Sequence, residues 1–317
     1  MTVATGFEEQ LAPYRGELLA HCYRMLGSAH DAEDLVQETY LRAWRAREQY
    51  DAGRSSIRTW LYRIATNACL TALESRGRRP LPSGLVAASD PRAPLVHGGE
   101  VPWLQPFPDA WLDGEDPAGM IVRRSSVRLA FAAALQGLSA RERAALVLRD
   151  VVGFSAEETA DAVGTTVPAV NSALQRARGR LRGIEDRTES AREPSAGEQR
   201  AWVDRYTAAF ERADVEGLVR LLADDVVMEM PPMVNWFAGT DAYAVFMRWV
   251  YAVGGADWRT VPVGSNGQPA FAAYRHDGDG YALHTLQVLT VTGDRISRTS
   301  VFQDTEVFAC FGLAARL

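Results

Sequence analysis

A segment rich in amide and guanidinium side chains, residues 166–182, contains no carboxylate. Its members that could bond to a partner are Asn171, Ser172, Gln175, Arg176 and Arg178. Amide and guanidinium groups form hydrogen bonds with base edges in the major groove of DNA, and arginine also pairs with phosphates. These residue types therefore predict a surface that binds duplex DNA. The alternative is the polar face of an ordinary helical bundle.

Two predicted helices position this surface. Ser155 is expected to cap the first helix, and Gly164 is expected to end it in the left-handed conformation. Thr166 is expected to cap the second helix, with Pro168 in the first turn, where a missing N–H is tolerated. Apolar residues then recur with helical spacing at Val170, Leu174, Ala177 and Leu181. The pattern predicts a helix-turn-helix whose second helix carries the recognition face.

Near the N-terminus, residues 30–46 predict a helix with a charged face. Its first turn holds carboxylates, which the positive end of a helix dipole favours. Gln37, Glu38 and Arg42 are expected to face solvent. These side chains are free either to bind a protein partner or only to solvate the helix.

The next segment, residues 55–80, predicts a helix with a narrow buried stripe of small residues. On its other faces Trp60 and Tyr62 alternate with Arg58 and Arg63. This combination suits single-stranded DNA, because bases stack on aromatic rings and arginine follows the phosphates. The alternative places Trp60 in the core.

These two segments, followed by the helix-turn-helix, resemble the sigma-70 family of bacterial RNA polymerase initiation factors in its small extracytoplasmic-function (ECF) form. The resemblance covers residues 7–80 and 120–183 and rests on the runs DAEDLVQETYLRAW and TWLYRIATN. It implies a first all-α domain at 7–80 for polymerase binding and promoter melting, and a second, the helix-turn-helix, at 120–183. It also implies two partners, core RNA polymerase through its β and β′ subunits, and promoter DNA.

The resemblance assigns residues to three tasks. Core polymerase binding is expected at Asp34, Gln37, Glu38, Leu41 and Arg42. Melting and the downstream promoter element are expected at Tyr50, Arg54, Arg58, Trp60, Tyr62, Arg63, Asn67 and Arg76. The upstream element is expected at Thr166, Pro168, Ala169, Asn171, Ser172, Gln175, Arg176 and Arg178. Asn67 and the loop before its helix are expected to hold an extruded base, because stacking and edge hydrogen bonds offset the lost pairing.

The formal net charge of −6 is unfavourable for a DNA-binding protein. The charge is unevenly distributed, however. Residues 123–187 hold eleven arginines and seven carboxylates, whereas residues 198–317 hold ten arginines and fifteen carboxylates. Because local charge decides where phosphates bind, the helix-turn-helix region remains suited to DNA.

An acidic linker rich in Pro and Gly is predicted at residues 81–119. In the resembled family the equivalent linker threads polymerase near its active site; the alternative is a solvated tether. The run 101–114 holds Trp103, Leu104, Phe107 and Trp111. Aromatic residues at this density predict docking on a protein surface.

A second linker is predicted at 184–197, and residues 198–317 show helical and then strand-like patterns, an α+β order. The runs WFAG, NGQPAF and HTLQVLTV resemble sequences of the SnoaL-like (NTF2-like) family, whose fold is a cone-shaped domain with a pocket. The expected fold class is therefore multidomain, two all-α sigma domains followed by this α+β domain. Possible pocket residues are Glu229, Trp236, Tyr243, Trp249, His284 and Asp304.

The C-terminal domain is expected to regulate the sigma domains, and a small-molecule ligand of its pocket stays an open alternative. Enzymes of this fold use an Asp or His, but the sequence forces no acid–base pair together. His284 and Gln287 can face opposite sides of a strand, because their separation is odd. We therefore predict no catalytic residue, no enzyme activity and no cofactor. The alternatives are a small-molecule-responsive DNA-binding regulator that acts without polymerase, and an enzyme activity in this domain.

Cys22, Cys69 and Cys310 lack the spacing of metal ligands, so no metal site is predicted. Cys22 and Cys69 are expected to be buried thiols. The sequence has no apolar signal segment and no apolar run of about 18 residues, so we expect a cytoplasmic protein without membrane contact.

Overall fold

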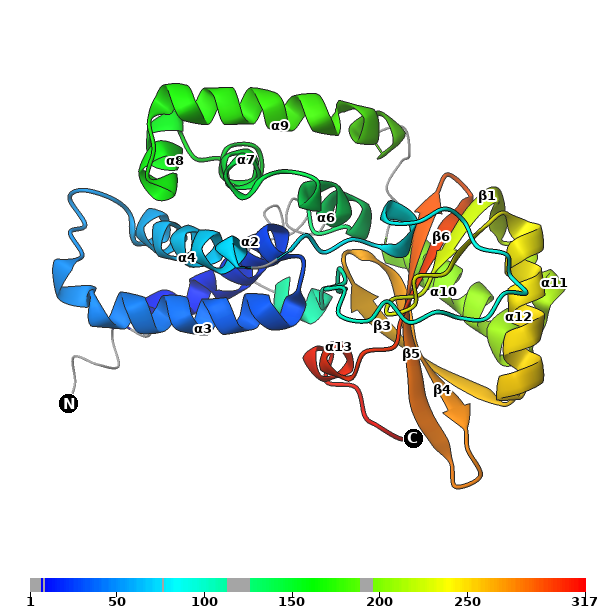
Figure 1. Ribbon diagram of the computed structural model, residues 1–317. Coiled ribbons are helices and arrows are strands. Elements are labelled where there is room, and N and C mark those ends of the chain that lie inside the picture. The colour runs from blue at the N-terminus through cyan, green and yellow to red at the C-terminus, as the bar shows by residue number, and fades with distance from the viewer. Residues whose placement is uncertain (1–6, 8, 76, 113–125, 189–195) are drawn as a thin grey trace. The chain divides into compact units, whose positions relative to one another are not determined.

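The computed structural model describes residues 7, 9–75, 77–112, 126–188 and 196–317. The chain divides into two compact units (Figure 1), and each is described by itself. The helical unit comprises residues 1–79 and 109–187, and the C-terminal unit comprises residues 80–108 and 188–317. Within the described residues, no helix combines the length and the apolar character needed to cross a membrane.

The first part of the helical unit is a bundle of three main helices. Its elements are η1 (Ala12–Tyr14), α2 (Arg15–Leu26), α3 (Ala29–Arg45), η2 (Arg47–Gln49) and α4 (Ile57–Glu74). Local signals set the helix ends. Gly27, at φ 71°, ends α2 in the left-handed conformation. The hydroxyls of Ser28 and Ser56 cap α3 and α4 by accepting backbone N–H bonds.

The core of this bundle holds the two cysteines that were predicted to be buried. Cys22 and Cys69 have no exposed surface, and both are free thiols, so this prediction is confirmed. A hydrogen bond with Cys22, together with burial, raises the pKa of Cys69 well above its usual value. Because the thiolate is the reactive form, these residues act as small apolar packing groups.

The second part of the helical unit contains the helix-turn-helix. Its elements are η4 (Asp109–Leu112), α6 (Leu129–Gln136), α7 (Ala140–Leu146), the π-helical turn η5 (Val147–Val151), α8 (Ala156–Val163) and α9 (Val167–Thr188). The predicted start and end of α8 and the predicted start of α9 are confirmed. Ser155 forms a capping box with Glu158, Gly164 ends α8 at φ 68°, and Thr166 Oγ1 accepts a bond from the N–H of Ala169 at 3.4 Å.

Buried arginines join the two parts of the helical unit. Arg143 on α7 is 3% exposed and donates to the carbonyl of Met25 and, at 2.9 Å, to Oε1 of Gln136. Arg24 on α2 donates from Nε to the carbonyl of Ser126 at 3.2 Å. Burial lowers the pKa of Arg143 to about 10, so its guanidinium stays charged at neutral pH. A buried charge is tolerated only with such partners, so these bonds fix α7 and α2 together.

The C-terminal unit is an α+β domain built on one six-stranded sheet. Its helices are α10 (Ala196–Glu211), α11 (Val215–Val219), α12 (Thr240–Gly254) and α13 (Thr305–Cys310). Its strands are β1 (Leu222–Glu229), β2 (Trp236–Ala238), β3 (Trp258–Ser265), β4 (Gln268–His276), β5 (Tyr281–Thr292) and β6 (Arg295–Phe302). The strand order is β2-β1-β6-β5-β4-β3, and β1 pairs with β6 in parallel while the other neighbours are antiparallel.

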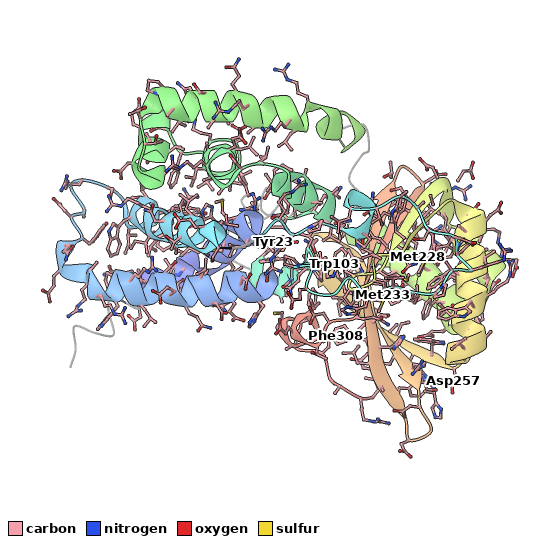
Figure 2. All side chains as sticks on the ribbon, in the orientation of Figure 1. Tyr23, Trp103, Met228, Met233, Asp257 and Phe308 are labelled. Carbon is pink, nitrogen blue, oxygen red and sulfur yellow. The ribbon has the colours of Figure 1, made fainter. Side chains whose placement is uncertain are left out.

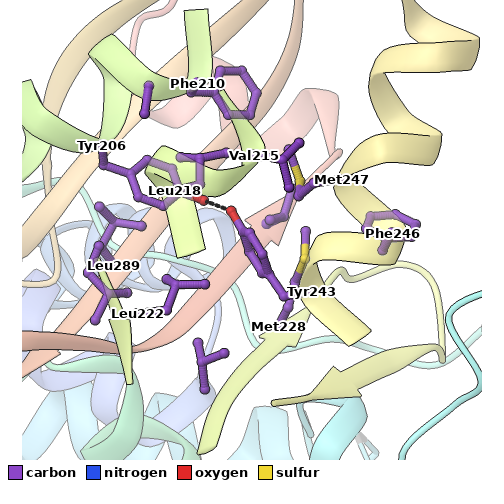
Figure 3. Packing of buried hydrophobic residues seen from close by; sticks show 14 of the residues in the cluster. Tyr206, Phe210, Val215, Leu218, Leu222, Met228, Tyr243, Phe246, Met247 and Leu289 are labelled. Atoms are coloured by element: carbon purple, nitrogen blue, oxygen red, sulfur yellow. Dashed lines mark hydrogen bonds between the residues drawn. The ribbon is translucent and has the colours of Figure 1, made fainter. Parts of the chain in front are cut away.

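The core of this unit lies between the sheet and the helices α10, α11 and α12 (Figure 3). Phe210 of α10, Leu218 of α11 and Leu289 of β5 all belong to this core. The hydroxyls of Tyr206 and Tyr243 are hydrogen-bonded to each other in this core. Because a buried hydroxyl needs a partner, this pair orients α10 and α12 toward each other.

Residues 80–108, which we call the strap, fold as part of the C-terminal unit. The strap contains η3 (Pro82–Gly84) and is largely irregular, but it is held by hydrogen bonds. Its Val96 N–H donates to Oδ1 of Asn235 at 2.6 Å, and the indole N–H of Trp236 donates to the carbonyl of Val86 at 2.8 Å. The predicted docking of the aromatic run is confirmed for Trp103, Leu104 and Phe107, which are buried. Trp111 lies instead in η4 of the helical unit.

Candidate nucleic-acid interface and ligand cavity

One exposed stripe runs along α3. The residues expected to bind polymerase, Asp34, Gln37, Glu38, Leu41 and Arg42, recur with a spacing of three or four and share one helix face. Glu38 and Arg42 pair at 2.8 Å, and the Leu41 side chain is 52% exposed. Leu41 is the large apolar side chain exposed on this face of α3.

Two aromatic residues of α4 that were expected to meet DNA are buried instead. Trp60 is 6% exposed and packs on Tyr50, with ring centroids 5.0 Å apart. Tyr62 is 2% exposed, lies 5.3 Å from the ring of Phe154, and donates its hydroxyl to Oε2 of Glu17 at 3.1 Å. The expectation of exposed rings is therefore corrected for this arrangement of the helical unit, because each ring fills space between packed helices.

The polar face of α4 is paired with α8 of the helix-turn-helix. Arg63 NH1 lies 3.2 Å from Oδ2 of Asp161, and Thr59 Oγ1 donates to Oε1 of Glu158 at 3.3 Å. The two α8 carboxylates thus occupy the hydrogen-bonding groups that a phosphate would use. Sequence patterns did not reveal this contact, because the partners are about a hundred residues apart.

The remaining expected melting residues are placed in different surroundings. Arg54 is exposed in the loop before α4, and Asn67 is exposed and donates to the carbonyl of Arg63 at 2.9 Å. Arg58 donates from Nε to Oε2 of Glu17 at 2.9 Å. Arg76 lies outside the described residues.

The helix α9 has the two faces that the sequence predicts. Its buried stripe consists of Val170, Ala173, Leu174, Ala177 and Leu181. The residues expected at the upstream element, Thr166, Pro168, Ala169, Asn171, Ser172, Gln175, Arg176 and Arg178, are all exposed. A continuous polar face is therefore available for a DNA groove.

The arginines of this face are already paired within the helical unit. Arg176 donates to Oε1 of Glu142 at 2.9 Å, and Arg178 forms two bonds to Asp150 at 2.9 and 2.7 Å. Arg180 also bonds to Glu142, at 2.9 Å. Although burial opposes it, the bonds from Ser139 and Arg176 lower the pKa of Glu142. The arginine side chains remain more than half exposed, whereas the carboxylate of Glu142 is buried.

The C-terminal unit contains a cavity of about 220 Å³. Its walls come largely from α12 and from strands on both halves of the sheet. Met228 of β1 and Met233, from the segment between β1 and β2, also line it, and both are labelled in Figure 2. Sequence reasoning identified Trp249 and His284, which line the cavity. It missed Arg275 and the methionines, because no local pattern marks a residue as cavity-lining.

Four other pocket candidates do not line this cavity, which corrects their expected position. The Glu229 carboxylate is fully buried and pairs with Arg298 at 2.6 Å. Trp236 bonds to the strap, and Tyr243 bonds to a core tyrosine. Asp304 caps α13. Each polar group is used by its neighbours and does not reach the cavity.

A β-bulge brings His284 to the same cavity as Thr285 and Gln287. On β4, Ala273 pairs with Thr285 and Tyr274 pairs with Leu283, so His284 is the extra residue. A bulge shifts the alternation of side chains by one residue. The expectation that odd spacing separates His284 from Gln287 therefore fails here.

Comparisons with known proteins agree with this architecture. Models of Sigma-70 region 2, Sigma-70 region 4 and the SnoaL-like domain match residues 11–79, 128–181 and 203–299. The ECF RNA polymerase sigma factor SigG of Mycobacterium tuberculosis is 50% identical over 312 residues, which cover 97% of this chain and 84% of the relative.

SigJ, another ECF RNA polymerase sigma factor of Mycobacterium tuberculosis, is similar over most of its length. Its sequence is 27% identical over 290 residues, which cover 88% of this chain and 85% of SigJ. Its crystal structure aligns with a TM-score of 0.63 at 22% identity, and the alignment covers 96% of this chain and 99% of that chain. The solved structure thus has the same fold.

The Glu142 pairs lead to a prediction about acid stability. Because the folded-state pKa of Glu142 is lowered, its charged form stabilises the fold above the unfolded pKa of about 4.3, and this contribution is lost as the pH falls through the folded pKa. We expect Glu142→Gln to lower the free energy of unfolding by about 1–2 kcal/mol at pH 7 and by less near pH 3.5. Urea denaturation at both values measures it. Glu74→Gln, at the exposed end of α4, is the control, and an equal loss at both values would contradict the assignment.

Proposed function

Since this chain belongs to the family of ECF RNA polymerase sigma factors, we propose how its surfaces divide the work of promoter-specific initiation. Sigma factors are transcription initiation factors, not enzymes, and they bind RNA polymerase. We infer that this protein acts in the cytoplasm, where RNA polymerase works. The α3 stripe contacts core polymerase, α9 contacts the upstream promoter element, and α4 with its preceding loop holds the melted downstream element.

The single observation that carries the polymerase-binding assignment is the exposed stripe of α3. It combines an exposed leucine with charged residues on the side opposite to the buried Val36, Thr39 and Ala43. Its polar side chains leave the bundle core untouched, so the stripe is free for a partner. A central apolar side chain ringed by polar groups is a common hot-spot arrangement.

The assignment of α9 to duplex DNA is supported by its exposed polar face. Asn171, Ser172 and Gln175 are exposed near the N-terminal end of the helix, the end that enters the groove in helix-turn-helix proteins. Arg178 pairs with the partly exposed Asp150, and a surface ion pair of this kind contributes about 0–1 kcal/mol. Exchange of Asp150 for a phosphate therefore changes the free energy little.

We further propose that the helical unit described here is a closed arrangement that precedes DNA melting. Tyr62 is buried against Phe154, and Arg63 is paired with Asp161 of α8. A strand of DNA cannot stack on Tyr62 or pair fully with Arg63 while Phe154 and Asp161 hold these groups. Separation of α4 from α8 is then a step on the way to promoter opening.

The C-terminal unit is proposed to regulate this opening through the strap. In sequence the strap connects α4 to the helix-turn-helix part, but it folds with the C-terminal unit. When the strap is seated, the chain between the two helical parts is restrained; when it is released, the same residues become a longer flexible tether, which changes the effective concentration of one part near the other. A small molecule in the cavity is a natural means of setting this balance.

The first test concerns the α3 stripe. Leu41→Glu should lower the affinity for core RNA polymerase by about tenfold or more, because a charge replaces a central apolar contact. The substitution is at an exposed position, so the thermal unfolding of the free protein should not change. Binding is measured by titration with labelled core enzyme. Leu317→Glu, at another exposed leucine, is the matched control, and equal affinity of both variants would refute the assignment.

The second test concerns sequence recognition by α9. Asn171→Ala and Gln175→Ala should each weaken binding to the cognate duplex by about 1–3 kcal/mol if the side chain bonds to a base edge, and should relax the preference at that base. Duplex binding and start-site mapping of transcripts from genomic DNA provide the readouts. The matched control is Gln49→Ala, an exposed glutamine in η2. Unaltered promoter choice in both α9 variants would exclude this face.

The third test concerns the closed arrangement. Asp161→Arg replaces the partner of Arg63 with a like charge, so the free protein should bind a fluorescent single-stranded oligonucleotide about fivefold more tightly, as expected from the loss of one surface pair. Asp204→Arg makes the same charge change at an exposed position of α10 and serves as the control. If both variants gain equally, added charge alone explains the gain and α8 does not block α4.

A further inference from the structure

The cavity of the C-terminal unit is apolar over most of its wall. Four methionines, Met228, Met230, Met233 and Met247, contribute to it together with aromatic rings. Methionine adapts its shape to a ligand and is frequent in binding sites that accept apolar groups. At about 220 Å³ the cavity is larger than the engineered cavity of about 150 Å³ that binds benzene.

One end of the cavity is polar and lacks negative charge. His284 lies there against the ring of Trp258, 5.4 Å between centroids, with Nε2 3.2 Å from Nε2 of Gln303. Arg275 also lines this end, and it forms no ion pair within the part of the chain that the structure describes. None of the lining residues is an Asp or Glu. The arginine therefore offers an uncompensated charge to whatever enters.

Arg275 is partly exposed at the cavity wall and lies beside the C-terminal end of α12. A Cβ at Gly254 would be in ordinary van der Waals contact with Arg275, 3.6 Å from its Nη1 atom. Burial and the charge of Arg275 lower the pKa of His284, so this ring is neutral at pH 7 and does not compete for an anion. The polar end thus holds one cation and several neutral hydrogen-bonding groups, among them Gln303.

We propose that this cavity binds a small apolar carboxylate, with the carboxylate paired to Arg275 and the apolar body against the methionine and aromatic walls. This inference rests on the proposed function, because it names the class of ligand through which the C-terminal unit would act on the helical unit. A guanidinium forms two parallel bonds to a carboxylate, which a neutral alcohol or ketone cannot match. Burial of the apolar body supplies the remaining affinity.

The strap forms part of this site. Leu95 of the strap lines the cavity and is 36% exposed, and the next residue, Val96, bonds through its N–H to Asn235 and through its carbonyl to the N–H of Val234 at 2.9 Å. His97 forms a β-bridge with Met233, which also lines the cavity. A ligand that contacts Leu95 therefore adds contacts that exist only when the strap is seated, and binding stabilises the seated strap.

A second hollow lies between the strap and α12. It has a volume of about 370 Å³ and is lined by residues 91–95 of the strap and by the α12 residues Val245, Phe246 and Trp249. Leu95, Phe246 and Trp249 line both spaces. The strap therefore rests on side chains that also form the cavity wall, so a ligand that contacts them contacts the support of the strap.

Titration calorimetry of the full chain tests the ligand class. The probes are octanoate and 2-naphthoate, and their neutral analogues are 1-octanol and 2-naphthol. We expect at least one acid to bind with a Kd below about 1 mM and its neutral analogue to bind about tenfold more weakly. Absence of binding by both acids at that concentration, or equal binding of acids and neutral analogues, overturns the proposal.

Substitutions locate the site. Arg275→Gln should weaken acid binding about tenfold and leave the neutral analogue unchanged, whereas Arg248→Gln, an exposed arginine of the same unit that does not line the cavity, should bind like the wild type. Val250→Trp should fill the cavity and abolish binding of every probe. Circular dichroism verifies that each variant is folded. Unchanged acid binding in a folded Arg275→Gln or Val250→Trp variant overturns the proposal.

Hydrogen exchange tests the role of the strap. Addition of the bound acid should slow exchange of the Val96 and Gly98 amides, which bond to the C-terminal unit, and Leu95→Ala should weaken both effects. Unchanged exchange at saturation overturns the strap coupling. Core binding through α3 is measured without any probe, so a failure of the cavity and a failure of the proposed polymerase contact give different results.

Discussion

Two reciprocal hydrogen bonds between Phe107 and Asn266 anchor the end of the strap in the C-terminal unit. The N–H of Phe107 donates to Oδ1 of Asn266 at 2.8 Å, and the N–H of Asn266 donates to the carbonyl of Phe107 at 2.9 Å. Neither residue has exposed surface, and a buried amide left unpaired costs about 1–3 kcal/mol. Asn266 and Gly267 form the tight turn between β3 and β4, and both have positive φ. In this turn the backbone N–H and the side-chain oxygen of Asn266 are both available to pair with Phe107.

This anchor has a consequence for the whole chain, because the strap stands between the two helical parts in sequence. A segment that belongs structurally to the last domain also sets the length of the connection between the first two. Any change in the C-terminal unit that loosens the strap, such as a change near Leu95 or Asn235, alters that connection without touching a DNA-binding residue. In our proposal the domains are thus coupled through the chain connection that the strap forms.

The helical unit uses the same chemistry internally that it offers to nucleic acid. Arg63, Arg176 and Arg178 are paired with carboxylates of neighbouring helices, at geometries that a phosphate oxygen could take over. The pairs of Arg63 and Arg178 are at least partly exposed, whereas the Glu142 carboxylate that Arg176 binds is buried. In our proposal, the burial of Tyr62 against Phe154 is the larger barrier to opening. Core polymerase, which binds elsewhere on α3 in our proposal, would supply the energy for this rearrangement.

The sequence by itself determined the helix ends and the division of α9 into two faces, since caps such as Ser155 and the spacing from Val170 to Leu181 act within a few residues of chain. The family motifs likewise identified both sigma domains and the SnoaL-like domain. Only the tertiary structure decided that Tyr62 packs against Phe154 in a loop distant in the chain, that a bulge turns His284 into the cavity, and that the strap folds with the last domain. Each of these features depends on contacts between residues far apart in the chain. The composition and periodicity of one segment do not indicate which distant segment it will contact.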